Sequence, residues 1–462
     1  MYPFYIAFGF SLVVLSSVLF AIKPTWGVYA MVFLVPVSQY DLYFAPMGEW
    51  NIRWFEDSYL NAWPVFTPVL LSVCLGVILR KGASLWVSQV IRPTKIILIA
   101  IAVYAAFTML WSENIWHSLF QYYYLVSFMI LFYLVISTMA TEEIHRKMIW
   151  CLLFSCLVQA LLSYVFRFTG SFVEKADIGD IRFALHVLGG MMNSDGSPVQ
   201  AHGLQDGHVT SMWMNIMMGV ATGLFLTEKK VGRRIFLALC FVIGLSVLIG
   251  TESRGGAAAF VAMVMFFLFF YHRTSKYLIR SIVIFFAAFL VFYVVEQRIF
   301  STLAGKEEAI MRLLMIGQKS LETGDVLDPG LSALEGVGPG RMTIWGNGFS
   351  GLSQNWLGIG IGNYKYLYAI PHAHSVLFSF LFDLGPIGLI LLVSLFYHII
   401  KYYLKVIKLQ DTYLQIMSLC LMSAFTAVMF HGCFDFDYTY PIYWLFWGYV
   451  FSTLILVNKR AG

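Results

Sequence analysis

Three basic residues lie in or directly beside polar interruptions of an apolar sequence, and an ionisable side chain at such a boundary costs free energy. Arg254 lies in the short break Thr-Glu-Ser-Arg-Gly-Gly at 251–256, and Arg341 and His374 lie within and directly after the polar stretch 296–373. A guanidinium presents a fixed fork of donors that matches phosphate oxygens. An imidazole is the usual general base near neutral pH. These residue types favour a substrate that carries a phosphate anion and a hydroxyl nucleophile.

Each of the three also has an ordinary interpretation. An arginine at a membrane boundary can extend to water without binding anything, and a histidine at a helix start is more often a cap or a packing residue. Arg341 and Trp345 are four residues apart, so on a helix they share a face. Gly358, Gly360 and Gly362 do not fit a dinucleotide-binding fingerprint, because the third comes one position early. They favour a turn that packs closely on neighbouring helices.

The composition is that of a membrane protein. Of 462 residues, 60% are hydrophobic and 12% are charged, and the mean hydropathy is +0.76, whereas a soluble domain is about 45–50% apolar and about 25% charged. Recurring apolar runs predict an all-α polytopic membrane protein with about 12–14 transmembrane helices, and 1–462 is expected to be one integral membrane domain. The expected spans lie near 3–22, 25–38, 62–79, 95–110, 119–139, 148–166, 209–226, 234–250, 256–271, 281–295, 374–400, 412–430 and 441–457.

The distribution of charge predicts the orientation in the membrane. Lys and Arg gather in alternate loops, for example at 229–234 and 401–408, and such loops face the cytoplasm. The C-terminus is then cytoplasmic. The large outer loop 296–373 precedes the third-last span, and helical spacing at 305–321 predicts an amphipathic helix within it. The segments predicted to face outward are 39–61, 111–118, 167–208, 251–255, 296–373 and 431–440.

Tryptophans and cysteines favour ordinary structural roles. Trp111, Trp116 and Trp213 lie near predicted span boundaries and are interpreted as interface anchors. All cysteines except Cys433 fall in apolar runs, so no disulfide framework is predicted.

The histidine belongs to a longer pattern that resembles the bacterial O-antigen ligase and O-antigen polymerase superfamily. The resemblance covers 230–400, and its motifs stand in the family's order. The motifs are His374-Ser375 followed at fixed spacing by Gly385 and Gly388, Ser-Arg-Gly at 253–255, Arg341 with Trp345, and Leu-Gly-Ile-Gly-Ile-Gly-Asn at 357–363.

This resemblance implies a membrane-embedded glycosyltransferase of the C type that needs no metal and no other cofactor. Its donor would be a glycan on undecaprenyl diphosphate, and its acceptor hydroxyl would belong to a glycan, a lipid A core or a protein. The reaction would take place at the periplasmic face of the bacterial inner membrane, within the lipid bilayer and without nucleic acid. By the same resemblance, Arg254 and Arg341 would bind the diphosphate and His374 would deprotonate or orient the acceptor hydroxyl. Trp345 and Ser375 would support them.

Two other polar clusters offer alternative sites. His431, Asp435 and Asp437 share one outward segment, and an Asp-x-Asp pair is typical of metal-dependent glycosyltransferases, but nucleotide sugars are absent outside the cytoplasm. An ordinary polar loop is the first interpretation of this segment. A role for Asp435 in orienting His374 or pairing an arginine comes second and is favoured over a metal site. The stretch 177–208 has no zinc spacing; it could contact glycan or acceptor, or form an ordinary loop.

The alternatives differ in what is joined. A ligase joins finished glycan to lipid A core or protein, whereas a polymerase joins repeat units; the complete histidine motif favours the ligase and the extended segment 167–208 favours the polymerase. A transporter or flippase of lipid-linked glycans would bury charge at mid-membrane and often carry repeats. The apolar runs are interpreted as free of ionisable residues, which argues against an ion-coupled pathway. A structural scaffold is the remaining alternative.

Overall fold

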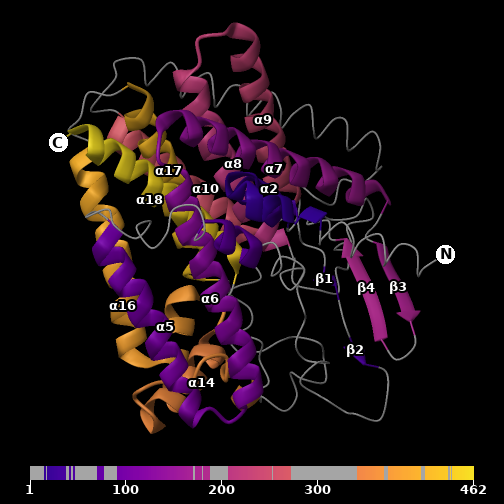
Figure 1. The fold of residues 1–462 in the computed structure, drawn as a ribbon, viewed down its shortest axis with the longest axis vertical. Helices are drawn as coiled ribbons and strands as arrows, with labels where there is room; N and C mark the ends of the chain where they lie inside the picture. The colour runs from indigo at the N-terminus through magenta and orange to yellow at the C-terminus, as the bar shows by residue number, and fades with distance from the viewer. Residues whose placement is uncertain are drawn as a thin grey trace, which may run out of the picture.

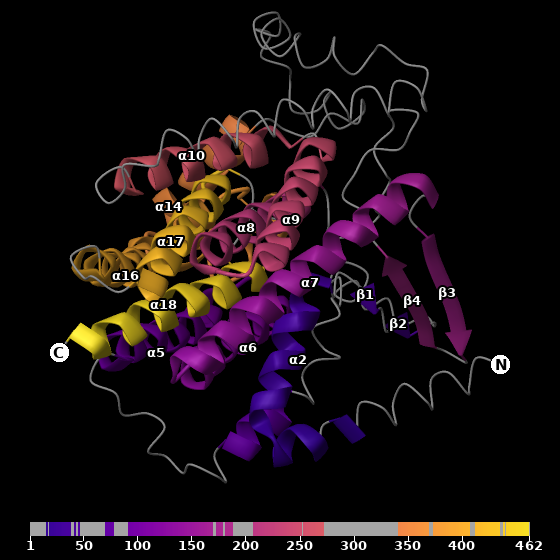
Figure 2. The same cartoon turned by 90° about the horizontal axis from the view of Figure 1, so that it is seen from above.

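The chain is an all-α polytopic membrane protein with one small β-sheet at its side (Figures 1 and 2). Nine helices in the described part of the chain are long and apolar enough to cross a membrane. The computed structural model describes residues 15–16, 18–37, 41–42, 45–46, 70–77, 91–169, 172–178, 181–187, 207–251, 253–271, 341–368, 373–406, 412–434, 438 and 440–461.

The spanning helices coincide with nine of the expected spans. The expected span 25–38 corresponds to α2 (Pro24–Val37), which is shorter than the roughly 20 residues that cross a bilayer. The expected spans 3–22, 62–79 and 281–295, and the amphipathic helix at 305–321, lie wholly or partly outside the described residues, so the count of about 12–14 spans stays a prediction. The spanning helices are α5 (Ile91–Thr108) with the 3-10 turn η2 (Met109–Trp111), α6 (Ile115–Thr138), α7 (Glu142–Thr169), α8 (Gly207–Thr227), α9 (Val231–Gly250), α10 (Arg254–Tyr271), α16 (Val376–Val406), α17 (Thr412–Gly432) and α18 (Pro441–Ala461).

The segment 167–208, which is predicted to face outward, is not the simple loop that the sequence suggests. α7 continues to Thr169, and the strands β3 (Phe172–Ile178) and β4 (Ile181–Val187) pair antiparallel, with Ile178 opposite Ile181. Two short strands, β1 (Asp41–Leu42) and β2 (Ala45–Pro46), also pair with β4. The sheet therefore joins two segments, 39–61 and 167–208, that the charge pattern assigns to the same side of the membrane.

Small residues bring α8 and α17 close together at the centre of the bundle. A Cβ on Gly219 would lie 2.7 Å from the Cβ of Ala424, and one on Gly223 would lie 2.9 Å from the sulfur of Met417. Because lipid tails are as apolar as leucine, helices in a membrane associate through such close backbone contact rather than through hydrophobic burial. The pair α8 and α17 is thus closely packed at the centre of the bundle.

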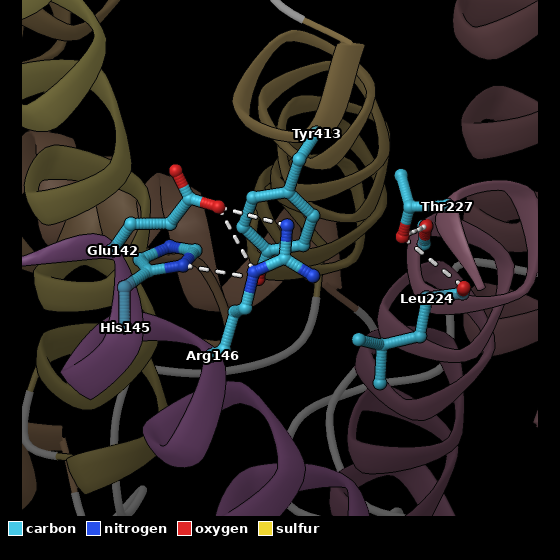
Figure 3. A network of polar contacts seen from close by, with 7 residues as sticks. Glu142, His145, Arg146, Leu224, Thr227 and Tyr413 are labelled. Carbon is cyan, nitrogen blue, oxygen red and sulfur yellow. Dashed lines mark hydrogen bonds and ion pairs between the residues drawn. The ribbon is translucent and has the colours of Figure 1, made fainter. Parts of the chain in front are cut away.

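A buried histidine joins three helices at the ends predicted to be cytoplasmic. His145 is fully buried on α7; its Nε2 lies 2.7 Å from the Thr453 hydroxyl of α18 and its Nδ1 lies 3.3 Å from the Tyr413 hydroxyl of α17. Thr453 gives its proton to the Tyr449 carbonyl at 2.8 Å, so Nε2–H donates and Nδ1 accepts. Figure 3 shows Arg146 over the Tyr413 ring, at 3.5 Å from its centroid.

Replacing His145 with Phe is expected to destabilise the bundle while keeping the ring packing. The variant loses two interhelical hydrogen bonds, each worth about 0.6–1.7 kcal/mol in a membrane, so a loss of about 1–3 kcal/mol is expected. Thermal unfolding in detergent measures it. His398→Phe, on the half-buried His398 of α16, is the matched control; equal effects of the two substitutions would contradict the role of His145.

Candidate functional site

Helix α14 (Arg341–Gln354) contacts the chain directly before His374, and Arg341 lies one turn of the helix away from that contact. Arg341 is the first residue of the helix and is exposed. Trp345, on the same helix as predicted, donates its indole N–H to the Ala373 carbonyl at 2.9 Å. The indole therefore ties the start of α14 to the residue that precedes the candidate base.

An aromatic cluster packs α14 against the first turns of α16. The ring of Phe378 lies 4.7 Å from that of Trp345 and stacks on Phe382 at 5.5 Å, and Phe382 stacks on Tyr364 of the short helix α15 (Tyr364–Tyr368) at 5.9 Å. The Tyr364 hydroxyl donates to the Ile344 carbonyl. Burial raises the pKa of Tyr364 above its ordinary value, so the hydroxyl stays protonated and keeps donating. The cluster holds α14 and His374 in a fixed relation.

His374 has a backbone conformation that residues other than glycine rarely adopt. Its φ is +48°, which costs of order 1–3 kcal/mol and persists only when the surroundings require it. The capping role that a histidine could have at this position belongs instead to Ser375. The buried Ser375 hydroxyl accepts from the Phe378 N–H at 3.3 Å, at the first turn of α16. The half-buried imidazole of His374 is thus left outside the helix that Ser375 caps.

Helix α16 is broken at Gly385, which has φ +64° and is followed by a proline. That proline has no N–H for the Phe382 carbonyl four residues before it. The carbonyls of Phe382 and Asp383 accept instead from the N–H groups of Ile359 and Gly360, at 2.8 and 3.0 Å. The glycine-rich loop 355–364 therefore completes the hydrogen bonding of the broken helix.

The glycines of that loop are required by this contact. Gly358, Gly360 and Gly362 have φ of +99°, +95° and +72°. A Cβ on Gly358 or on Gly385 would lie 2.5–2.6 Å from backbone atoms of the opposite segment. This is the closely packed turn that the sequence predicts, and it accounts for the first glycine of the histidine motif.

Asp383 is a buried carboxyl that the sequence analysis did not single out. It is 5% exposed, and its Oδ2 accepts from the Gly362 N–H at 3.1 Å and from the Tyr438 hydroxyl at 2.7 Å. Because Asp383 lies within a spanning helix, the interpretation of the apolar runs as free of ionisable residues is wrong. A lone aspartate before Gly-Pro in an apolar run was the signal that could have identified it.

The corner between α5 and α6 clamps the other side of the glycine-rich loop. Trp111 donates its indole N–H to the Gly358 carbonyl at 2.9 Å, and Ser112 donates to Oδ1 of the buried Asn363 at 3.0 Å. Trp111 is half-buried and anchors the loop, a contact that its position in the sequence did not suggest. Trp213 is not the expected interface anchor, because it is buried within the bundle; nothing is described for the side chain of Trp116.

The turn that carries Arg254 is held by α8. Arg254 is exposed and begins α10, and the hydroxyl of the buried Ser253 caps the helix by accepting from the Gly256 N–H at 3.0 Å. On α8, His208 Nδ1 lies 2.9 Å from the Ser253 hydroxyl, and Asn215 donates to the Gly256 carbonyl at 3.1 Å. Two side chains of one helix therefore hold the start of another.

The candidate residues thus fall into two assemblies. Arg341, Trp345, His374 and Ser375 belong to one, on α14 and α16, whereas Arg254 belongs to the other, on α8 and α10. The helix α17 packs along both α8 and α10 (Figure 2). Tyr438, which follows α17 in the chain, donates its hydroxyl to the Asp383 carboxylate of α16. Asp435 lies outside the described residues, so its expected position near His374 stays a prediction.

The described residues contain no group of three or more His, Cys, Asp or Glu side chains that could hold a metal ion. Asp435 and Asp437 of the weighed Asp-x-Asp pair are not among those residues.

Comparison with known proteins bears on this arrangement. Residues 239–393 match the O-antigen ligase family. The matched segment is about a third of the chain and contains Arg254, Arg341, His374 and the glycine-rich loop. It supports membership of the O-antigen ligase and polymerase superfamily, as the motifs at 230–400 suggested. No curated protein matches the chain.

Replacing Asp383 with Ala is expected to destabilise the glycine-rich loop more than replacing Tyr438 with Phe. The first change leaves two buried donors without their acceptor, at about 1–3 kcal/mol each, whereas the second removes one donor. The Phe substitution should add little in the Asp383→Ala background, because the partner of the hydroxyl is then already gone. Thermal unfolding in detergent measures all three variants. Tyr397→Phe, at an exposed tyrosine of α16, is the control, and strictly additive effects would argue against the bond.

Proposed function

We propose that this protein is an inner-membrane glycosyltransferase of the O-antigen ligase type. It transfers a glycan from undecaprenyl diphosphate to an acceptor hydroxyl at the periplasmic face. The observation that carries the proposal is that Arg254 and Arg341 each begin a helix and His374 stands just before a third, all within the segment that matches the family.

Helix starts strengthen the attraction of these side chains for an anion. The unsatisfied N–H groups at a helix N-terminus amount to about half a positive charge, and they favour phosphate. A guanidinium at the same place adds a full charge and a fork that fits two oxygens. Two such starts, on α10 and α14, suit a ligand with two linked phosphates. His374, in contrast, is placed by the strained backbone before α16 and is not part of a helix.

The proposed reaction is a displacement at the anomeric carbon. The acceptor oxygen forms a bond to that carbon while the bond from the carbon to the diphosphate oxygen breaks, and the electron pair leaves with undecaprenyl diphosphate. His374 takes the proton of the acceptor hydroxyl. Arg254 and Arg341 stabilise the charge that develops on the leaving diphosphate. The donor is already activated, so the scheme needs neither a nucleotide nor a metal ion.

Charge distribution supports the periplasmic side. The loops rich in Lys and Arg alternate with the segments that carry the candidate residues, and positive loops remain inside. His208, Ser253, His374 and Trp111 all lie at helix ends that the same rule assigns to the outside. A donor assembled in the cytoplasm and moved outward would meet the site there.

The hydrogen bonding of α16 argues against the flippase alternative. Ion-coupled transporters use broken helices whose exposed carbonyls and buried carboxylates bind the coupling ion. Here the carbonyls at the break accept from Ile359 and Gly360, and the Asp383 carboxyl accepts from Gly362 and Tyr438. These contacts favour an anchor for the loop over a site for a moving ion.

Replacing His374 with Ala in the native host is expected to lower transfer by about 10²–10⁴-fold, the usual contribution of a general base. Surface glycans separated on a gel show the result. Long chains that remain on undecaprenyl diphosphate identify a ligase, and single repeat units in place of chains identify a polymerase.

Two outcomes would overturn the proposal. Unchanged glycans would remove His374 from catalysis, and repeat units that fail to reach the periplasm would indicate a flippase. His398→Ala, on α16 and away from the site, controls for the loss of a histidine from this part of the chain. Protein levels in the membrane are compared by immunoblot so that a failure to insert is recognised.

Arginine variants test the diphosphate ligands. Arg254→Ala and Arg341→Ala are each expected to lower transfer by about 10²–10³-fold, as the removal of a donor from a developing anion does elsewhere. Lysine should recover only part of the activity, because it keeps the charge but not the fork. Arg92→Ala is the matched control, since Arg92 is an exposed arginine in the first turn of α5. Full activity in Arg254→Ala or Arg341→Ala would exclude that residue.

A further inference from the structure

One face of α8 contacts the turn of Arg254 on both sides of that residue. His208 and Asn215 are seven residues apart, so they lie two turns apart on the same face of the helix. His208 Nδ1 lies 2.9 Å from the Ser253 hydroxyl, and Asn215 Nδ2 donates to the Gly256 carbonyl at 3.1 Å. The arginine is thus bracketed by residues that α8 holds.

The start of α10 is seated against α8 without spare room. A Cβ on Gly256 would overlap the side chain of Ser211, which itself donates to the His208 carbonyl at 2.6 Å. The α10 axis can therefore neither approach α8 more closely nor accept a larger residue at this position. The direction in which Arg254 leaves the helix follows from how the start of α10 is held.

The hydrogen bond between His208 and Ser253 acts on the cap of α10. The Ser253 hydroxyl accepts from the Gly256 N–H at 3.0 Å and is 4% exposed. Because the hydroxyl is buried, water is poorly placed to replace the imidazole. The other side of the His208 ring packs edge-on against the fully buried His431 at 5.9 Å between ring centroids.

We propose that His208 is a positioning residue for the diphosphate-binding site, acting on Arg254 through Ser253. The inference rests on the proposed function, because it assumes that Arg254 binds the diphosphate of the donor. An exposed arginine side chain is flexible. Its guanidinium can bind an anion with two hydrogen bonds more readily when the backbone of the arginine is held in place. His208 supplies that fixation from α8 and does not itself touch the donor.

Two substitutions separate hydrogen bonding from ring packing. His208→Asn keeps a polar atom close to the position of Nδ1 and can still bond to Ser253, but it loses the ring. His208→Phe keeps a ring against His431 but cannot bond to Ser253. A positioning role through Ser253 predicts that Asn is tolerated and Phe is not, whereas a packing role predicts the reverse.

The test measures the affinity of the full-length protein in lipid nanodiscs for undecaprenyl diphosphate. His208→Phe is expected to weaken binding by about two- to tenfold, which corresponds to the loss of one neutral hydrogen bond. His208→Asn should bind within about twofold of the unmodified protein, and Ser253→Ala should resemble His208→Phe. In the Arg254→Ala background, His208→Phe should have no further effect, because the residue through which it acts is gone.

The outcomes separate this inference from the proposed function. If Arg254→Ala weakens binding but His208→Phe and Ser253→Ala do not, or if His208→Phe adds fully to Arg254→Ala, the role of His208 is excluded and that of Arg254 stands. If Arg254→Ala leaves the affinity unchanged, the diphosphate assignment itself fails. Size-exclusion profiles and thermal unfolding identify a variant that misfolds. If His208→Phe misfolds, His208→Asn decides, because weakened binding in a folded Asn variant would exclude the role of His208.

Discussion

A backbone carbonyl without a partner inside a bilayer costs several kcal/mol, and α16 is interrupted within its span. The interruption at Gly385 is possible because Ile359 and Gly360 supply the N–H groups that the helix itself lacks. This exchange requires the loop backbone to approach closely and to turn three times through positive φ, which explains its alternating glycines. The loop and the break therefore depend on each other, and neither would be stable in lipid alone.

The hydrogen bonds between the glycine-rich loop and the break in α16 also determine the geometry of the candidate site. The glycine-rich loop directly follows α14, which carries Arg341, and the helix that it completes begins just after His374. Fixing the loop to the break thus ties the chain that follows Arg341 to the helix that follows His374. Two further anchors come from segments distant in sequence. Trp111 donates from the α5–α6 corner, and Tyr438, which lies between α17 and α18, donates to Asp383. The strained backbone of His374 can be maintained in such a framework.

Sequence reasoning succeeded where a pattern is local. Apolar runs predicted the spanning helices, a four-residue spacing placed Arg341 and Trp345 on one helix, and misplaced glycines excluded a nucleotide fingerprint. It failed where a partner lies far along the chain. Asp383 bonds to Tyr438, 55 positions away, and Trp213 resembles a boundary residue although it is buried within the bundle. The hairpin at 172–187 was missed because its charged residues resemble a loop, although strand pairing satisfies its backbone.

Both Arg254 and Arg341 lose side-chain entropy when they bind an anion, and a different backbone contact holds each of them. Donors stabilise a developing charge best when they need no rearrangement during the reaction, yet an arginine side chain has about 2 kcal/mol of rotamer entropy to lose. The structure restricts the backbone instead of the guanidinium. Trp345 ties the first turn of α14 to Ala373, and Ser253 ties the first residue of α10 to α8. Trp345 on α14 and Ser253 at the start of α10 belong to separate assemblies, and α17 packs against helices of both. The distance between the two guanidinium groups therefore depends on helix packing rather than on either loop.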